Sequence, residues 1–217
     1  MSRPCIALLG GSFDPPHKGH LALGDYFVRL LQPDQLRIVP AGSPWQKPEL
    51  QTSPEDRAEM ARLAFEDLPA QVAIDPQEIH RKAPTYTIDT LRALRTELGP
   101  DASIVLLIGA DQLQQLHTWK DWRQLFDYAH ICAAARPGFA MDEAHVPAQV
   151  AEEVVRRIGT VERIRESAHG LSHLANDLAV DISATQIRAA LQRGERVDAL
   201  IPPRVLDYIK QHHLYQS

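Results

Sequence analysis

Two histidines three residues apart, His17 and His20, follow a pair of glycines near the start of the chain, in the segment GGSFDPPHKGH. An apolar run before this segment predicts a strand that ends at Gly10 and Gly11, and glycines there allow a backbone to approach a phosphate closely. At the start of a helix, a spacing of three places both imidazoles on one face. The helix N-terminus between them is expected to offer free N–H groups to an anion. Either histidine alone is most simply a surface residue, but the combination favours phosphate binding.

A second cluster, ISATQIR, lies far along the chain. Ser183 with Gln186 three residues later is a capping-box pattern, so a helix is expected to begin at Ser183. Arg188 follows Thr185 by three residues, and the hydroxyl and the guanidinium can therefore face one anion. A helix N-terminus with two hydroxyls and an arginine suits a triphosphate.

A third cluster, Gly109 to Asp111, directly follows the most apolar run of the sequence. Parallel sheets bind ligands at the carboxyl ends of their strands, so Asp111 stands where a ligand is expected. Its carboxylate can accept hydrogen bonds from a ribose, or it can cap the next helix. The residue types leave both interpretations open.

A fourth group combines Tyr86 and Thr87, at the start of a predicted helix, with Trp119 and Trp122. Either Tyr86 or Thr87 can simply cap that helix. Two tryptophans three residues apart are more often packed in a core, although an exposed member would offer a flat ring for stacking. His169 and His173 are four residues apart but have no pair of acids nearby, and we interpret them as surface residues.

Short apolar runs alternate with helical patterns along the chain, which predicts an α/β fold with a parallel sheet. Strands are expected at residues 6–9, 36–39, 72–74, 104–108 and 131–135. Helices are expected at residues 20–31, from Ser53, at 87–98, at 148–158, from Ser183, and in a last segment that ends near His212. The wholly apolar strands fit a sheet that is covered on both faces. Apart from 148–158, residues 139–177 give no clear pattern.

The composition limits the classes of protein. The chain has 217 residues, 44% of them hydrophobic, which is the size of one domain over residues 1–217. A net charge of -5 makes nucleic acid a poor partner. No signal peptide and no apolar stretch long enough for a membrane is present, so a cytoplasmic protein is expected. Cys5 and Cys132 each lie in an apolar run and are interpreted as buried small side chains.

GGSFDPPHKGH together with ISATQIR resembles the paired signature of the HxGH nucleotidyltransferase superfamily. More narrowly, the chain is similar to the bacterial nicotinate-nucleotide adenylyltransferases. The further matches are EIHRKAPTYTIDTL, LLIGADQL with the following TW, RPG and VLDYIKQHHLY, which span nearly the whole chain. The resemblance implies a Rossmann-like, doubly wound parallel sheet with a small helical C-terminal part from about residue 183 to residue 217.

The resemblance also implies a role for each matched residue. The groups that would act on the ATP phosphates in catalysis are His17, His20, Lys47 and Arg188. The groups that would bind the rest of ATP are Gly10, Gly11, Phe13, Gly109, Asp111, Ser183 and Thr185. The groups that would bind the pyridine mononucleotide are Tyr86, Thr87, Trp119 and Arg136.

One segment departs from the family pattern. The family usually has Pro-Pro-His-Lys or Pro-Pro-His-Arg after the second strand, whereas this chain has Pro44, Trp45, Gln46, Lys47 and Pro48. Lys47 keeps the cation, but Gln46 stands in place of the histidine. The role of that histidine is therefore not assigned to any residue of this chain.

The reaction implied is adenylyl transfer from ATP to nicotinate mononucleotide, with release of pyrophosphate and with Mg²⁺ held by the substrate rather than by protein ligands. Two rivals are the same chemistry on nicotinamide mononucleotide or on phosphopantetheine. A rival from another class is a sensor that binds ATP or NAD without catalysis. The sequence leaves a homo-oligomer open.

Overall fold

The computed structural model describes residues 3–43, 50–81, 83–134, 146–176, 178 and 182–215, and within them six strands form one sheet. The strands are β1 (Cys5–Gly11), β2 (Gln35–Pro40), β3 (Val72–Ile74), β4 (Ser103–Gly109), β5 (His130–Ala134) and β6 (Ser172–Ala175). The α-helices are α1 (Lys18–Leu31), α2 (Pro54–Phe65), α3 (Thr87–Leu98), α4 (Ala110–Gln115), α5 (Ala148–Val155), α6 (Val161–Glu166), α7 (Ala184–Gln192) and α8 (Pro203–Gln211). Two 3₁₀ helices, η1 (Leu116–Thr118) and η2 (Trp122–Asp127), follow α4.

The strands lie in the order β3-β2-β1-β4-β5-β6, and every neighbouring pair is parallel. The chain winds outward from β1 to β3, then returns to the centre and winds the other way from β4. The order therefore reverses between β1 and β4, and open α/β sheets bind ligands in the crevice at the carboxyl ends of such strands. The predicted doubly wound α/β fold is confirmed.

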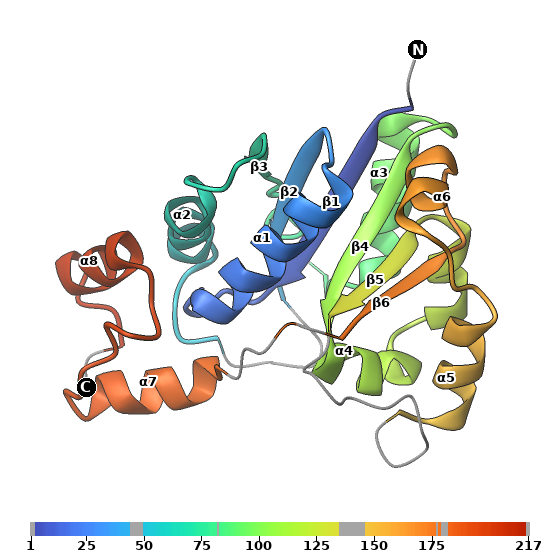
Figure 1. Cartoon of the computed structure of the whole chain (residues 1–217). Helices are drawn as coiled ribbons and strands as arrows, with labels where there is room; N and C mark the ends of the chain where they lie inside the picture. The colour runs from blue at the N-terminus through green and yellow to red at the C-terminus, as the bar shows by residue number, and fades with distance from the viewer. Residues whose placement is uncertain are drawn as a thin grey trace.

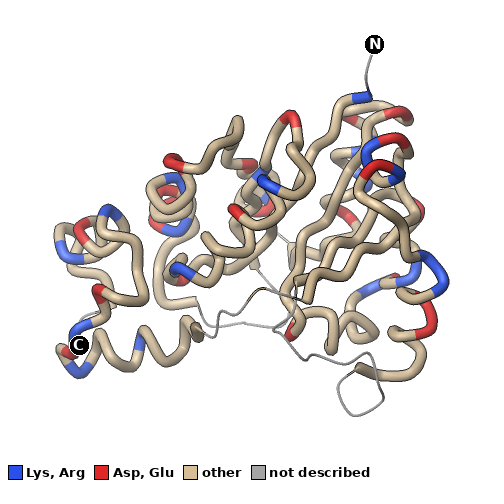
Figure 2. The backbone as a smooth tube through the Cα atoms, viewed as in Figure 1, with Lys and Arg blue, Asp and Glu red and all other residues tan. Residues whose placement is uncertain are grey.

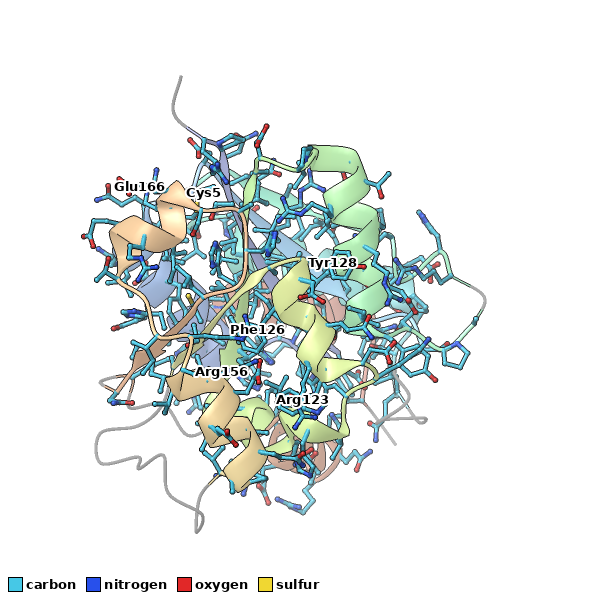
Figure 3. The ribbon with its side chains drawn as sticks, turned by 90° about the vertical axis from the view of Figure 1, so that its right-hand side faces the viewer. Cys5, Arg123, Phe126, Tyr128, Arg156 and Glu166 are labelled. Carbon is cyan, nitrogen blue, oxygen red and sulfur yellow. The ribbon has the colours of Figure 1, made fainter. Side chains whose placement is uncertain are left out.

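Alternate residues of the central strands face opposite sides of the sheet. Ala7 and Leu9 of β1 belong to the cluster of buried side chains that includes α1, α2, α7 and α8. Leu8 belongs to the other cluster, which includes α3, α5 and η2 (Figure 1). Figure 3 views the molecule from the side of β6 and α6, and Tyr128 is labelled there between η2 and α3. The Tyr128 hydroxyl is 3.4 Å from Arg92 Nε. Both faces are buried, as wholly apolar strands require.

Charged side chains lie mainly on the helices and loops, while the strands carry few of them (Figure 2). Within the sheet, Arg37 of β2 is the charged residue of the described strands, and it forms ion pairs with Glu97 and Asp75. None of the helices in the described part of the chain combines the length and the apolar character needed to cross a bilayer. Cys5 and Cys132 are both buried free thiols, as expected.

The helical C-terminal part is made of α7 and α8. In Figure 1, α8 lies beside α2, and α7 lies at the lower edge, toward which the carboxyl ends of β1 and β4 point. The Tyr208 hydroxyl of α8 donates to Asp56 Oδ1 of α2 at 2.9 Å, and Arg204 forms an ion pair with Glu66, the C-cap residue of α2. The C-terminal part is therefore packed against the helix layer that contains α1 and α2.

Three features differ from the sequence-based expectations. The region 139–177, which gave no clear pattern beyond one helix, contains α6 and the edge strand β6. The two tryptophans do not share one helix, because Trp119 follows η1 and Trp122 begins η2. Trp122 is buried in the core, whereas Trp119 is half-buried. The predicted segment 131–135 is a strand one residue earlier, at His130–Ala134, and Ala135 lies outside the described residues.

Candidate active site

The loop after β1 is shaped by Gly11 and Phe13. A Cβ atom on Gly11 would lie 3.0 Å from the Phe13 ring, so the glycine makes room for that ring. Phe13 has a φ of 49°, in the left-handed region, and its side chain is 0% exposed. The expectation that Phe13 contacts ATP stays a prediction, and it now concerns the backbone rather than the ring. Its ring packs edge-on against His20 at 5.1 Å in the core, and only its backbone can face a ligand.

His17 and His20 lie on one face at the start of α1, as predicted. Their rings are stacked, with centroids 3.7 Å apart and an interplanar angle of 21°. The His17 N–H donates to His20 Nδ1 at 3.2 Å. Because Nδ1 accepts a hydrogen bond, neutral His20 carries its proton on Nε2, which is the form that can donate to a phosphate oxygen.

The N-terminus of α1 differs from the prediction that its N–H groups are free. The Lys18 N–H donates to the Leu200 carbonyl at 2.9 Å, and Lys18 Nζ lies 3.2 Å from the Asp198 carbonyl. The segment between α7 and α8 therefore covers this helix end. The imidazole groups, rather than the Lys18 amide, are the groups of this helix end suited to bind an anion.

The start of α7 lies against the loop after β1. Arg188 Nη1 donates to the Asp14 carbonyl at 2.7 Å across 174 positions of sequence, and its Nη2 lies 3.3 Å from Thr185 Oγ1. The two predicted phosphate clusters are thus brought together. Ser183 is the N-cap residue, but the expected capping box is absent, since its side chain forms no capping hydrogen bond and Gln186 is exposed.

The third cluster lies at the carboxyl end of β4, beside β1. The register pairs Leu9 with Leu107, so the residues that follow on the two strands share one edge of the sheet. A Cβ atom on Gly109 would lie 2.7 Å from Asp111 Oδ1, so a side chain there would displace this carboxylate from its place. Asp111 is exposed in the first turn of α4, and its carboxylate accepts from the side chain of Gln112. An exposed carboxylate at this edge can accept hydrogen bonds from a ribose.

The fourth cluster gathers around the start of α3. Tyr86 is the N-cap residue of α3 without a side-chain capping bond, and Thr87 is the first helical residue. Lys120 Nζ lies 4.6 Å from the centre of the Tyr86 ring, which joins this helix end to the segment that carries Trp119. Trp119 is half-buried against the second cluster of buried side chains, and its Nε1 has no hydrogen-bond partner among the described residues.

Two sequence-predicted features lie outside the described residues. They are Arg136 and the segment from Pro44 to Pro48, which departs from the family pattern and includes Lys47. Gly10, near the end of β1, is exposed. The nearest atom to a Cβ there would be the Val39 carbonyl oxygen at 4.0 Å, so the protein itself leaves room at this position.

Arg57 is a site residue that the sequence analysis missed. Its guanidinium, buried beneath the loop after β1, donates to the carbonyls of Ser12 at 3.0 Å, of Ala41 and of Gly42 at 3.3 Å. It thereby ties the loop after β1 to the loop after β2, and burial lowers its pKa. One signal was present: Arg57 precedes the buried Met60 by three residues, so the helical period places it on the apolar face of α2.

Glu78 is a second missed residue. Burial raises the pKa of its carboxyl group, which accepts from Thr90 Oγ1 at 2.7 Å, and Arg81 in turn lies 3.0 Å from the same Thr90 oxygen. A Cβ atom on Gly42 would lie 2.0 Å from the Glu78 carbonyl, so the loop after β2 is packed directly on this segment. Glu78 therefore joins that loop to the start of α3.

His169 is exposed, as expected of a surface residue, whereas His173 is half-buried. His169 Nδ1 lies 3.1 Å from the Phe126 carbonyl, and His173 Nδ1 lies 3.3 Å from the Gly159 carbonyl. His173 is in β6 rather than on a helix. The described residues contain no group of three or more His, Cys, Asp or Glu side chains that could hold a metal ion.

A parallel sheet with two imidazoles after β1 and Arg188 beside them fits a Rossmann-like nucleotidyltransferase, and comparison with known proteins confirms that class. The cytidylyltransferase-like family model matches residues 8–190, so the chain belongs to this family. Within it, the chain belongs to the nicotinate-nucleotide adenylyltransferases, as the sequence resemblance indicated.

The similarity to curated relatives covers the whole chain. A protein of Herminiimonas arsenicoxydans named "Probable nicotinate-nucleotide adenylyltransferase" is 66% identical over 213 residues, 98% of this chain and 97% of its own. A protein of the same name from Dechloromonas aromatica (strain RCB) is 41% identical over 220 residues, covering 100% of both chains. The Plasmodium falciparum nicotinic acid mononucleotide adenylyltransferase, solved in complex with NaAD, has the same fold. Its TM-score is 0.73 at 20% identity, over 98% of each chain.

Proposed function

We propose that the chain transfers the AMP part of ATP to nicotinate mononucleotide and releases pyrophosphate. The product is nicotinate adenine dinucleotide, or deamido-NAD, and the reaction is a step of NAD biosynthesis. Besides family membership, the observation that carries the proposal is the bond between Arg188 and the Asp14 carbonyl. It joins the loop after β1 to α7, so two groups suited to phosphate lie in one place.

The transfer needs no protein nucleophile. An oxygen of the mononucleotide phosphate attacks the α-phosphorus of ATP in line with the bond to the bridging oxygen. The new P–O bond forms as the old one breaks, and the electron pair leaves with pyrophosphate. Catalysis then depends on positioning and on stabilising the charge that develops. His17, His20 and Arg188 supply donors and charge there, and we assign Lys47 to the same task.

ATP would lie along the carboxyl ends of β1 and β4. Gly10, Gly11 and the backbone of Phe13 would face its phosphates, and Ser183 with Thr185 would contact the β and γ phosphates. Gly109 and Asp111 would bind the adenosine. The fit is supported by the shared edge of β1 and β4 and by the Gly109 position, which leaves the Asp111 carboxylate its space.

Nicotinate mononucleotide would lie between the start of α3 and Trp119. The Trp119 ring would stack on the pyridine, and backbone N–H groups near Thr87 would receive the carboxylate. Tyr86 would line this pocket with Arg136 nearby. A site that bonds both carboxylate oxygens through N–H donors rejects the amide, because the amide's N–H₂ group cannot accept those bonds.

Mg²⁺ is the expected metal, bound with ATP. Asp14 belongs to the loop after β1, which we call the phosphate loop. Its carboxylate already accepts hydrogen bonds from Gln51 N, Thr52 Oγ1 and Tyr215 Oη. Such surroundings fit an ion held by phosphate oxygens and water, as Mg²⁺ commonly is. When bound, the ion would neutralise negative charge on the phosphates. Location in the cytoplasm and the absence of nucleic-acid and membrane partners are part of the same proposal.

The test is pyrophosphate release from Mg-ATP by the purified protein, with nicotinate mononucleotide, nicotinamide mononucleotide and phosphopantetheine supplied separately. Fast release with nicotinate mononucleotide alone is expected. Release with another acceptor would keep the chemistry and change the substrate. ATP binding without release for any acceptor would contradict the proposal and favour a sensor.

A further inference from the structure

The carboxylate of Asp14 lies in a buried contact between the phosphate loop and the C-terminal segment, where Asp14 is 1% exposed. Its Oδ1 accepts from Tyr215 Oη at 2.6 Å and from Thr52 Oγ1 at 2.9 Å. Its Oδ2 accepts from the Gln51 N–H at 2.9 Å. A carboxylate is costly to bury unless several donors satisfy it, and Tyr215 is one of the three donors here.

The same residue holds Arg188 through its main chain. The Asp14 carbonyl accepts from Arg188 Nη1 at 2.7 Å, and the guanidinium also contacts Thr185. Asp14 therefore connects the Tyr215 hydroxyl on its side chain with the Arg188 guanidinium on its backbone. A change in the place of the Asp14 carboxylate moves the carbonyl that orients this arginine.

The Tyr215 side chain is buried at this contact with Asp14 rather than exposed to solvent. It is 7% exposed and has a φ of 61°, a left-handed conformation that costs a residue with a side chain some free energy. The preceding Leu214 N–H donates to the Ile209 carbonyl at 3.0 Å, which turns the chain back from α8. Burial and the bond to Asp14 raise the pKa of the phenol, so Tyr215 stays protonated and remains a donor.

We propose that Tyr215 is a positioning residue for the phosphate side of the site. Its hydroxyl holds Asp14, and Asp14 holds Arg188 where the ATP phosphates bind. This inference rests on the phosphate role proposed above for Arg188. It predicts that removing a single oxygen atom more than two hundred positions away in sequence weakens ATP binding.

The test compares Tyr215→Phe with Tyr208→Phe. Each substitution removes one tyrosine–aspartate hydrogen bond between the C-terminal part and the body of the protein, but the Tyr208 bond goes to Asp56 on α2. The dissociation constant of ATP is measured by calorimetry, which needs no turnover, and the Tm and both KM values are measured as well. For Tyr215→Phe, we expect the dissociation constant of ATP and the KM for ATP to rise roughly tenfold, because a hydrogen bond to a charged group is lost. The KM for nicotinate mononucleotide should change less than about twofold.

For Tyr208→Phe, a loss of Tm without a change in ATP affinity is expected. In an Arg188→Ala background, Tyr215→Phe should cost less than about twofold more, because the two residues act as one unit. Equal ATP affinities for the two tyrosine variants, or a full tenfold loss in the Arg188→Ala background, would overturn the proposal. A wild-type protein that binds ATP without releasing pyrophosphate would instead contradict the proposed function, and the ATP affinities would still decide the role of Tyr215.

Discussion

At His20, a backbone hydrogen bond decides which ring nitrogen carries the proton. Nδ1 accepts from the His17 N–H, and the ring is packed between the His17 imidazole and the edge of Phe13. A ring fixed in this way needs no reorganisation to donate from Nε2 as charge develops on a phosphoryl oxygen. The left-handed φ of Phe13 thus goes with a ring that is packed against His20.

His20→Ala is expected to lower kcat about a hundredfold or more, because it removes one donor to the transition state. The measurement is steady-state pyrophosphate release at saturating ATP and nicotinate mononucleotide. His80→Ala is the matched control, since His80 is exposed. A kcat near that of the wild type for His20→Ala would contradict the catalytic role of His20.

Gly109→Ala is expected to displace the Asp111 carboxylate, from which the new methyl group would be 2.7 Å away. The KM for ATP should rise about two- to tenfold, the worth of one hydrogen bond to the ribose. The Tm should stay within about 2 °C, because the displaced atoms are the end of an exposed side chain. Asp111→Ala should give a similar KM, and the double variant should be no worse. Additive losses would argue against an adenosine role that passes through Asp111.

Residues whose partners lie within one helical turn could be predicted from the sequence. The spacing of three between His17 and His20, and between Thr185 and Arg188, was enough to place each pair together. The contact between Asp14 and Tyr215 could not be predicted, because no local pattern links residues 201 positions apart. The spacing also could not show that Leu200 covers the Lys18 amide.

At the scale of elements, α2 is held to the site by a buried charge. Its first residues follow the expected start, with Ser53 accepting from the Asp56 N–H and Pro54 in the first position. The buried side of the helix then presents Arg57 to the ends of two loops. Three carbonyls that leave the sheet edge are thereby satisfied by one side chain.

Arg57→Met should lower the free energy of unfolding by about 1–3 kcal/mol, because buried carbonyls lose their donor. Arg62→Met is the control on the same helix. Arg62 is half-exposed and pairs with Glu59 and Glu66, and exposed pairs contribute little, so a change below about 1 kcal/mol is expected. Urea unfolding of both variants measures the difference. If both variants lost the same free energy of unfolding, the buried contacts of Arg57 would contribute no more than the exposed pairs of Arg62.

His130 makes β5 sensitive to acid. The buried imidazole accepts from the Leu171 N–H at Nδ1 and so donates from Nε2 to the Ser167 carbonyl at 3.0 Å. Burial lowers its pKa from 6.5 to about 4. In the unfolded chain the ring takes up a proton below about pH 6.5, but in the folded protein it does so only near pH 4. The contribution of neutral His130 to the free energy of unfolding is therefore fully present above pH 6.5, and it is lost as the pH falls from 6.5 toward 4.

Between pH 7 and pH 5, the free energy of unfolding should fall by about 1–2 kcal/mol through this group. Urea unfolding at the two pH values measures the change. His130→Gln, which keeps a donor and an acceptor but does not titrate, should show a smaller dependence on pH. The same slope in both proteins would rule out His130 as the cause.

The elements themselves were largely predictable, and the exceptions have physical reasons. The apolar runs of β1, β2 and β4 are recognisable because both faces of these strands are buried. β6 has only four residues and includes Ser172 and His173, whose side chains bond to carbonyls, so no apolar period marks it. An edge strand is completed by its neighbour in the sheet, and a sequence pattern does not contain that neighbour.

At the scale of the whole molecule, both thiols lie in the first cluster of buried side chains, the one that includes α1, α2, α7 and α8. Burial raises the pKa of Cys5 and, more strongly, that of Cys132. A buried thiol without thiolate character is a poor nucleophile. The expectation of a single domain over residues 1–217 is compatible with this arrangement and stays a prediction.

Under native conditions, neither cysteine should react with a thiol reagent such as Ellman's reagent over minutes at pH 8. In denaturant both should react, giving two thiols per chain. The native rate then reports how often the sheet opens. Fast labelling of one thiol in the native protein would show that the layer covering it is locally unstable.

The hydrogen bond between Asp14 and Tyr215 joins residues that are synthesised at different times. The loop after β1 is among the first parts to leave the ribosome, but Tyr215, which donates to Asp14 in this loop, is synthesised 201 residues later. At about 5–20 residues per second, that interval is about 10–40 s. During synthesis the loop after β1 therefore exists for this interval without its bond to Tyr215, and a chain that ends before residue 215 cannot form that bond.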